Sequence, residues 1–340
     1  MATTLKDIAA RTGLSLPTVS HILSARGGAY REETRNRVLA AASALGYRPN
    51  ASARAVRAGR FGNVILLMSS DPGRSGLFPA LAHGMLDALD AQALRLTISR
   101  LPDAQLTDER TLPGVLRTWM GDGLLILYTA KMPARLIELV RRFRIPAVWV
   151  NADLPRDSVY PDEKRAAFLA TRRLLQAQPG PVYYGDFTYG ARAPDAHFSA
   201  RARYAGYAQA VREAGRRPLR MGLATRLERE DRLPWLAHWL PRQPRPLGVL
   251  CVAASTALPL CHAAAQQGRV IGRDLAVSTF GDAPVTLNGI ALDTWIVPMH
   301  EMGRRAVERL LARIENPRSA ASLRLPLDHA PGESVPGARA

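Results

Sequence analysis

Residues 4–47 carry the pattern that most constrains this chain, three short helices with a tight turn between the first two. The first helix is predicted from Leu5 to Thr12, because apolar residues recur there at helical spacing. Thr4 is placed to cap its N-terminus, with Asp7 three residues on as the reciprocal partner of a capping box. Gly13 then ends the helix, since glycine accepts the left-handed backbone conformation that a tight turn needs.

The second helix is predicted to start after Ser15, a favourable N-cap residue, and to run to about Leu23. Pro17 fits its first turn, where the missing N–H costs nothing. Val19, Ile22 and Leu23 are spaced to face the core. The side chains that remain on the outer side are those of Leu16, Pro17, Thr18, Ser20 and His21.

A third helix is predicted over 32–45 with Gly46 as its stop. Its predicted inward positions are Val38, Leu39, Ala42 and Leu45. Three helices with this turn match the helix-turn-helix, which places its second helix in a DNA major groove. The first 60 residues contain ten Lys or Arg against three acids, within a chain whose formal net charge is +17. Because the charge and the caps agree with the turn, we favour DNA binding over a small helical bundle without a nucleic-acid role.

Four stretches of this region resemble the lac and purine repressor (LacI-type) family. They are TLKDIAARTGLS at 4–15, TVSH at 18–21, EETRNRVL at 32–39 and LGYRPN at 45–50. The resemblance continues to about residue 335 and so covers nearly the whole chain. Arg31 departs from it, because the family usually has a serine there to cap the third helix. The resemblance implies that Thr4, Ser15 and the outer side chains of the second helix contact DNA.

The segment 50–57 is rich in alanine, and Asn50 is placed to cap a helix that is too short to be stable alone in water. In LacI-type proteins this stretch is the hinge helix, which pairs with its dimer mate and inserts an apolar side chain into the minor groove. The resemblance therefore implies DNA contacts for Asn50, Ala53, Val56 and Arg57. Val56 stands where the family usually has leucine. The valine side chain is smaller and stiffer than leucine, so the extent to which it kinks the DNA is left open. A plain linker is the alternative interpretation.

From Asn63 onward the pattern changes to alternating strands and helices, which predicts an α/β body of parallel sheets with helices on both faces. Strands are expected at 64–68, 94–98, 123–127, 146–150, 182–184, 248–252 and 276–280, and helices at 78–91, 109–120, 134–143, 163–177, 199–214, 229–240, 255–267 and from Pro298. Such sheets bind ligands at the carboxyl ends of their strands. Two such sets predict two similar subdomains with a cleft between them, and the resemblance implies a periplasmic-binding-protein-like body.

These patterns divide the chain into consecutive parts. We expect a helix-turn-helix domain over 1–49, the hinge helix and linker over 50–61, and an effector-binding and dimerisation domain over 62–335. The family's chain crosses between its lobes three times, which implies an N-lobe of about 62–160 and 294–323 and a C-lobe of about 161–293. We expect little structure from Pro331 onward, with a flexible tail at 336–340 that lacks the heptads of a coiled-coil tetramer.

The sequence contains no enzyme signature of the G-x-G-x-x-G, P-loop, H-E-x-x-H or G-x-S-x-G type, so we do not expect an enzyme. The seven histidines lack metal-ligand spacing, and we expect neither a metal site nor a cofactor. Cys251 and Cys261 lie in apolar surroundings, which predicts buried free thiols. No apolar run reaches membrane length, and Leu5-Lys6-Asp7 does not fit a secretory signal. We therefore expect a cytoplasmic protein with no membrane partner.

The resemblance also implies an effector site between the lobes. The residues it carries over to this site are Phe78, Thr129, Asn151, His197, Arg203 and Asp282. Arg203 would be the main anchor and Phe78 a stacking surface, although a solvated charge and simple core packing are the alternatives for these two. The family's usual carboxylates are replaced at Ala254 and Gly281, with Asp282 one place late. Fewer acids would then compensate Arg203, which predicts an effector with some anionic character.

Together these features predict a homodimeric, sequence-specific DNA-binding transcription regulator, most simply a repressor controlled by a sugar or a related metabolite. Its expected partners are a pseudo-palindromic double-stranded operator, the small-molecule effector and a second copy of the chain. One alternative is an effector-independent repressor whose body serves only for dimerisation. The other is a solute-binding protein for transport, against which the N-terminal DNA-binding pattern argues.

Overall fold

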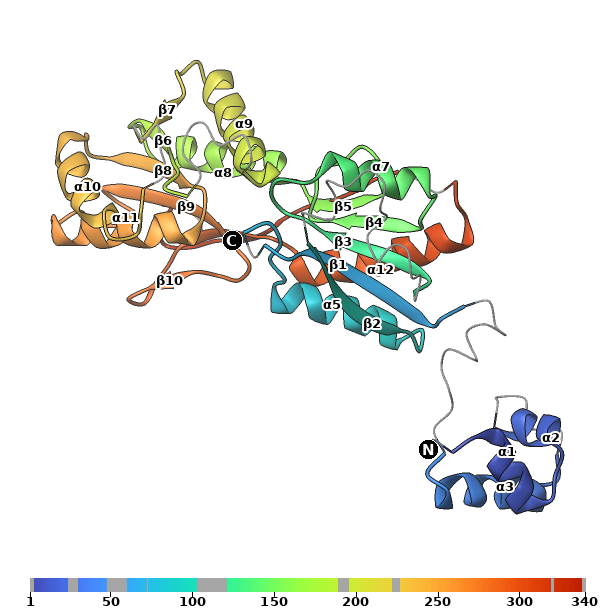
Figure 1. The fold of residues 1–340 in the computed structure, drawn as a ribbon. Coiled ribbons are helices and arrows are strands. Elements are labelled where there is room, and N and C mark those ends of the chain that lie inside the picture. Colours follow the sequence, from blue (N-terminus) through green and yellow to red (C-terminus); the bar gives the residue numbers. More distant parts are fainter. Residues whose placement is uncertain are drawn as a thin grey trace. The chain divides into compact units, whose positions relative to one another are not determined.

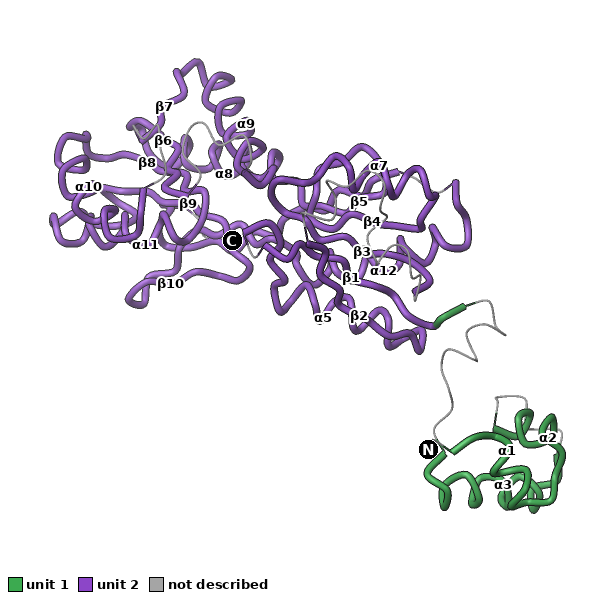
Figure 2. Tube along the Cα trace, in the orientation of Figure 1, with its two compact units in different colours: residues 1–61 green, residues 62–340 purple. Residues whose placement is uncertain are grey.

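The computed structural model describes residues 3–23, 30–47, 60–71, 73–102, 121–188, 196–221, 227–318 and 321–337. The chain forms two compact units, Met1–Phe61 and Gly62–Ala340, which Figure 2 shows in different colours. The predicted helix at 109–120 and the hinge segment at 50–57 lie outside the described residues.

The first unit is built from three helices, α1 (Leu5–Thr12), α2 (Leu16–Ile22) and α3 (Glu32–Ala44). The capping box predicted for α1 is present, since the Asp7 carboxylate accepts hydrogen bonds from the Thr4 backbone N–H and hydroxyl, both at 2.8 Å. Gly13 follows in the left-handed region at φ 69°. Ser15 caps α2 by accepting a hydrogen bond from the Thr18 N–H. The predicted bounds and caps of the first two helices are thus confirmed, and local sequence accounts for them.

One small core holds these helices together. Its buried side chains are Ile8, Val19, Ile22, Val38, Ala41 and Ala42. The prediction that Leu39 faces inward is wrong, because this side chain is 45% exposed. Leu39 lies one residue, or about 100°, around α3 from Val38. Ala41, Ala42 and Leu45 follow Val38 at spacings of three, four and seven, and these spacings share one helix face.

The second unit contains two six-stranded sheets and one two-stranded pair among its described residues. The first sheet has the order β13-β5-β4-β3-β1-β2, and all its strands are parallel. They are β1 (Asn63–Ser69), β2 (Arg95–Leu101), β3 (Gly123–Leu127), β4 (Ala147–Val150), β5 (Ser158–Pro161) and β13 (Leu323–Leu325). The central strands β1, β3 and β4 are almost continuous apolar runs, as expected of strands buried on both faces.

Helices cover both faces of the first sheet (Figure 1). One face packs against α5 (Pro79–Asp90) and α12 (Met299–Glu315), and the other against α7 (Ala134–Arg142). The helices α5 and α12 approach closely at Gly84, where a Cβ atom would lie 1.9 Å from the carbonyl oxygen of His300. This contact leaves no room for any other residue at position 84.

The second sheet has the order β14-β12-β9-β8-β6-β7, parallel except for β14, which runs antiparallel to β12. Its strands are β6 (Val182–Gly185), β7 (Leu219–Arg220), β8 (Leu247–Cys251), β9 (Leu275–Gly281), β12 (Asp293–Ile296) and β14 (Asp328–Ala330). The helices α8 (Glu163–Ala177) and α9 (Phe198–Glu213) cover one face, and α10 (Arg232–Trp239) and α11 (Ala254–Gln266) cover the other. A 3-10 turn (Leu240–Arg242) follows α10, and β10 (Thr286–Leu287) and β11 (Ile290–Ala291) form the separate pair.

The chain passes between the two sheets three times, after β5, after β12 and after β13. Each sheet with its helices therefore contains segments from distant parts of the sequence, and we call them the N-lobe and the C-lobe. One buried cluster includes side chains of both lobes, among them Leu66 and Met85 from the first and Tyr184 and Phe280 from the second. The predicted alternating α/β architecture with parallel sheets is confirmed.

The expectation of little structure from Pro331 onward is wrong for the residues up to Val335. Ser334 is fully buried, donates a hydrogen bond to the Val277 carbonyl at 2.5 Å and accepts one from the Asp293 N–H at 2.8 Å. Val335 is 2% exposed and belongs to the main core. The segment stays ordered because it satisfies backbone groups of β9 and β12 that burial would otherwise leave unpaired.

Two smaller observations complete the fold. Cys251 and Cys261 are buried free thiols, as predicted, and burial raises the pKa of Cys261 to about 12. Within the described ranges, none of the helices has the length and apolar character needed to span a membrane.

Candidate functional site

The exposed face of α2 is the first candidate site. Leu16 is 42% exposed, Pro17 and His21 are also exposed, and Thr18 and Ser20 are half-buried. The hydroxyls of Ser15 and Thr18 lie 2.8 Å apart and hydrogen bond to each other at the start of the helix. Apolar, imidazole and hydroxyl groups therefore share one surface of a helix whose other side is fixed in the core.

His21 is oriented from outside its own helix. Its Nδ1 atom lies 3.3 Å from the hydroxyl oxygen of Tyr30, which lies two residues before the start of α3. This hydrogen bond restricts the imidazole plane, so the ring is presented in a defined orientation. The sequence prediction did not include Tyr30, since a contact between residues nine positions apart leaves no periodic signal.

Thr4 lies at the N-terminal end of α1, away from the buried core. Its backbone N–H and its hydroxyl both donate to Asp7, and these bonds lower the pKa of the Asp7 carboxyl. The carboxylate also lies in the first turn of α1, where negative charge is favourable. The observed role of Thr4 is thus to fix the entry to the three-helix unit.

The second candidate site lies between the lobes, where residues that follow β4 contact residues that lie between β6 and α9. Asn151 directly follows β4 in the N-lobe, and His197 precedes α9 in the C-lobe. The Nε2 atom of His197 donates to the Asn151 carbonyl oxygen at 3.1 Å. Next to it, the rings of Tyr160 and Phe198 meet edge to face with centroids 5.7 Å apart. Of the effector residues predicted from the sequence, Asn151 and His197 are brought together directly.

His197 is held in one protonation state by its surroundings. Its Nδ1 atom lies 2.8 Å from the Ser199 hydroxyl and accepts from the Ser199 N–H at 3.4 Å, which caps α9. Burial lowers the pKa of His197, so the ring is neutral at physiological pH. With Nδ1 as acceptor and Nε2 as donor, the hydrogen-bond network assigns the Nε2–H tautomer. The ring therefore acts as a neutral hydrogen-bond donor towards Asn151.

Asn151 combines two unusual features. Its backbone lies in the left-handed region at φ 57°, which costs free energy for a residue other than glycine. Its side chain is only 5% exposed, yet its Oδ1 atom has no hydrogen-bond partner among the described residues. A buried acceptor without a donor is costly, typically by about 1–3 kcal/mol. Strain and an unsatisfied acceptor at one residue are typical of a ligand-binding position.

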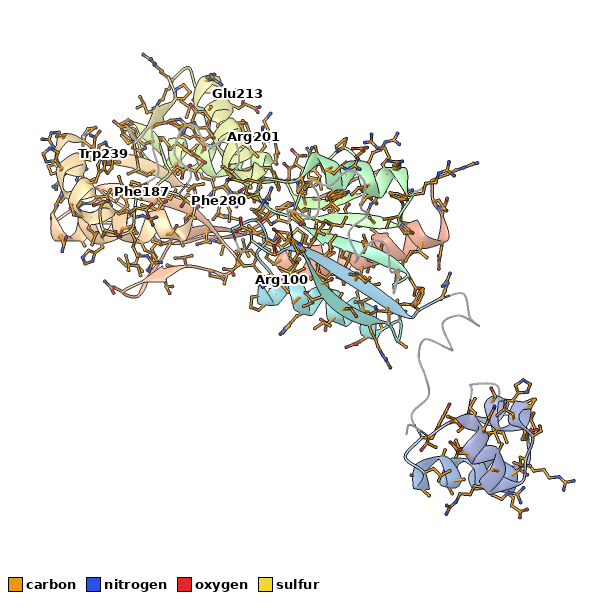
Figure 3. The ribbon with its side chains drawn as sticks, in the orientation of Figure 1. Arg100, Phe187, Arg201, Glu213, Trp239 and Phe280 are labelled. Carbon is orange, nitrogen blue, oxygen red and sulfur yellow. The ribbon has the colours of Figure 1, made fainter. Side chains whose placement is uncertain are left out.

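Arg203 is deeply built into the C-lobe. Its Nε and Nη2 atoms donate to the two carboxylate oxygens of Glu163 at 2.6 and 2.8 Å, and Nη1 donates to the Val252 carbonyl at 2.5 Å. The guanidinium also lies 4.1 Å from the ring centroid of Phe280, which Figure 3 labels on β9. The expectation that few acids compensate Arg203 is wrong, because a bidentate carboxylate neutralises it from the neighbouring helix.

Two family models match this chain. Residues 4–50 match the model described as bacterial regulatory proteins, lacI family, and residues 184–335 match a periplasmic binding protein-like domain. The first match covers the whole helix-turn-helix and the second covers most of the C-lobe together with α12. The chain therefore contains a lacI-family helix-turn-helix domain and a periplasmic-binding-protein-like domain.

Relatives along the full length agree with this. This chain is 24% identical over 336 residues to the HTH-type transcriptional regulator RegA of Clostridium saccharobutylicum, covering 97% of each chain. It is 27% identical over 328 residues to the ribose operon repressor of Haemophilus influenzae, covering 92% of each. A solved structure of the lac repressor dimer, bound to operator and the anti-inducer ONPF, has the same fold with a TM-score of 0.77 at 19% identity, over 99% of this chain and 100% of that one.

The remaining predicted site residues have no hydrogen bond or ring contact with His197 or Asn151 among the described residues. Phe78 caps α5 and is 41% exposed, so it is not core. The hydroxyl of Thr129 donates to the Arg74 carbonyl at 3.3 Å, and Asp282 lies exposed in the turn after β9. Asn50, Ala53, Val56 and Arg57 lie outside the described residues.

Sequence reasoning missed several partners in the second site. Glu163, the carboxylate on Arg203, lies at the start of α8 and is 2% exposed. Asp186 follows β6 with 8% exposure and accepts from the Thr188 N–H at 2.9 Å. Their positions in the sequence could have identified both residues. Asp186 follows a predicted strand and Glu163 begins a predicted helix, and both lie at the carboxyl edge of a sheet, where ligands bind. Among the described residues, no group of three or more His, Cys, Asp or Glu is arranged to hold a metal ion.

Proposed function

We propose that this protein is a DNA-binding transcription regulator, a repressor that recognises its operator through α2 and responds to a small molecule between the lobes. The observation that carries the DNA-binding part is the exposed face of α2, held by two caps and a packed core in a lacI-family unit. Leu16, Pro17 and His21 are the proposed readers of base edges. Thr18 and Ser20 are less exposed hydroxyl residues and suit contacts to phosphate.

The proposed effector site is the region around Asn151, His197 and Arg203. The buried Oδ1 atom of Asn151 needs a hydrogen-bond donor, which a hydroxyl or an N–H group of a ligand would supply. Because Glu163 neutralises Arg203 and His197 is neutral, we propose an uncharged, donor-rich effector in place of the anionic one expected from the sequence. A carbohydrate fits this class, and one relative is named a ribose operon repressor. The unsatisfied acceptor also argues against a body that serves only for dimerisation.

The two activities would be coupled through the lobes. A ligand that donates a hydrogen bond to the Asn151 side chain would bind next to the backbone carbonyl of the same residue. That carbonyl accepts the hydrogen bond from His197 of the other lobe. A ligand that binds one arrangement of the lobes more tightly shifts the population towards it, by as much as its affinities differ. We propose that this shift alters how the two DNA-binding units of a dimer engage the operator.

A dimer is favoured by one exposed apolar face of the N-lobe. Leu86 on α5 is 40% exposed and Ile98 on β2 is 55% exposed, and α5 packs beside β2. The strand β2 is the last one at its end of the sheet among the described residues. Exposed apolar side chains next to an open strand edge suit an isologous contact with a second copy. Because the proposed operator is chromosomal DNA, we also propose that the protein is cytoplasmic.

The full chain should bind a pseudo-palindromic site as a dimer, and an uncharged sugar should weaken that binding. The test combines footprinting on fragments of the source genome with a thermal-shift panel of neutral sugars and sugar phosphates. We expect a two-fold symmetric footprint and a melting temperature raised by a neutral compound. A footprint on one asymmetric half-site would contradict the operator proposal. A response to sugar phosphates alone would contradict the proposed effector class, and no response to any compound would favour the effector-independent alternative.

His21 is expected to specify one base pair in each half-site. Replacing His21 with alanine should relax preference at one symmetric pair of positions, at a cost of about 1–3 kcal/mol against the preferred base. Replacing Tyr30 with phenylalanine removes the hydroxyl that orients the ring and should give a weaker change of the same kind. Selection of bound sites from a randomised duplex library measures both. If His21→Ala weakened all sequences equally, His21 would be a backbone contact.

A further inference from the structure

A set of exposed arginines lies at one edge of the first sheet. We call Arg95, Arg141, Arg142, Arg144 and Arg318 the basic rim; all five are exposed. Arg95 begins β2, Arg141 and Arg142 end α7, Arg144 lies in the turn before β4, and Arg318 lies just beyond α12. Parallel strands all begin at the same edge of a sheet, and α7 and α12 return to that edge before the next strand starts. The topology therefore brings the five arginines to the amino edge of the N-lobe sheet, opposite the carboxyl edge where Asn151 lies.

The charge of the basic rim is not used inside the protein. None of its five members forms an ion pair with another described residue, whereas Arg135 pairs with Glu138 at 2.8 Å and Arg313 lies 3.5 Å from Asp157. Asp122, an acid at the same edge, already accepts a hydrogen bond from the Gly62 N–H at 2.9 Å.

The helix dipole accounts for only part of this set. Basic residues are favourable in the last turn of a helix, which explains Arg141 and Arg142 at the end of α7. It does not explain Arg95, at the start of a strand, or Arg144, in a turn with φ 50°. The Arg142 guanidinium lies over the ring of Phe143, 5.7 Å from its centroid, and Phe143 is itself 49% exposed. The edge therefore presents guanidinium groups and an aromatic ring to solvent.

The connectivity indicates which polyanion would meet this edge. The helix-turn-helix unit ends at Phe61 and β1 begins at Asn63, so the chain enters the second unit at the amino edge of this sheet. Between Tyr47, after α3, and Gly62 the chain can span at most about 50 Å when fully extended. A duplex held by the first unit is thus always within a tether's reach of the basic rim, at a high effective concentration.

We propose that the basic rim binds phosphates of the same DNA duplex that the helix-turn-helix unit holds. This inference rests on the proposed DNA-binding function and adds a second, sequence-independent contact surface to it. Arginine suits phosphate because its planar guanidinium donates paired hydrogen bonds. The contact raises affinity for all sequences alike, and it is lost as salt screens charges beyond about 8–10 Å.

The test uses the full chain and a fluorescein-labelled random-sequence duplex of about 40 bp, roughly four helical turns. Anisotropy titrations between about 50 and 200 mM KCl give the slope of log Kd against log salt. The test variant is Arg141→Gln with Arg142→Gln and Arg144→Gln. The matched control is Arg201→Gln with Arg212→Gln and Arg217→Gln, which removes the same charge from exposed positions on and after α9; Figure 3 shows Arg201 there. Thermal melts of both variants check that the fold is intact.

The rim variant should bind about ten-fold more weakly near 100 mM KCl, with a slope lower by about 1–3, since each phosphate contact contributes about 0.9. The control variant should stay within about two-fold of the wild type. Equal losses in both variants would assign the effect to net charge and overturn the proposal, as would no loss in either. A loss confined to a single-stranded RNA probe of equal length would make the rim an RNA surface and equally overturn it. If the wild-type protein itself did not bind duplex DNA, the proposed DNA-binding function would be contradicted instead.

Discussion

Replacing Val38 with aspartate is expected to unfold the first unit and abolish DNA binding. Val38 is fully buried in the core of that unit, which has six buried side chains among the residues that the structure describes. An ionised carboxylate without a partner in an apolar core costs several kcal/mol. A domain of 61 residues has a total stability of only about 3–9 kcal/mol, so this single change removes most or all of it.

The neighbouring residue supplies the control. Leu39→Asp adds the same charge one position along α3, but Leu39 is 45% exposed, so the unit should remain folded and keep most of its affinity. Anisotropy with duplex DNA measures binding, and circular dichroism melts follow both units. The transition of the second unit should be unchanged in both variants, because its cores share no residue with that of the first. Equal losses at Val38 and Leu39 would mean that charge, and not burial, decides the outcome.

This pair also shows how far the sequence could predict the first unit. The bounds of α1 and α2 follow from capping residues and a glycine turn, which act within a few residues of each other. The face of α3 was harder, because Val38 and Leu39 are adjacent and both apolar, and periodicity alone allows either to point inward. Packing against α1 and α2 selects Val38 and leaves Leu39 in solvent.

The same limit applies to the short strands of the second unit. The long apolar strands such as β1 and β3 were predicted, whereas β5, β12 and β13 were not. The strand β5 has four residues and ends in Pro161, and β13 pairs with it across more than 160 positions of the chain. Such strands are specified by distant neighbours, and their own residues show no clear period.

In the second site, the family resemblance located Asn151, His197 and Arg203, but not what surrounds them. The sequence suggested that the charge of Arg203 is less compensated, because two carboxylates usual in the family are absent from their positions. The structure supplies another carboxylate from Glu163, forty residues earlier on the preceding helix. Which acid neutralises a buried arginine depends on how α8 and α9 pack together, and no local pattern records this.

Replacing Glu163 with glutamine is expected to destabilise the second unit by about 3–5 kcal/mol, the usual cost of leaving one partner of a buried ion pair uncompensated. The Glu163 and Arg203 side chains are only 2% and 10% exposed, so water cannot take over the role of the lost carboxylate. The remaining guanidinium would keep its hydrogen bond to Val252 and its contact with Phe280, but no charge would balance it. Urea denaturation followed by circular dichroism measures the loss, and the transition of the first unit should not move.

Two further variants separate the ion pair from simple loss of a hydrogen bond. Glu301 on α12 also pairs with two arginines at 2.7 Å, but its side chain is 38% exposed, so Glu301→Gln should cost less than about 1 kcal/mol. Combining Glu163→Met with Arg203→Met removes both buried charges, and this double variant should be more stable than Glu163→Gln. A cost at Glu163 no larger than that at Glu301 would show that Arg203 finds another compensating group. An uncharged effector would then no longer be favoured, because that proposal depends on Glu163 neutralising Arg203.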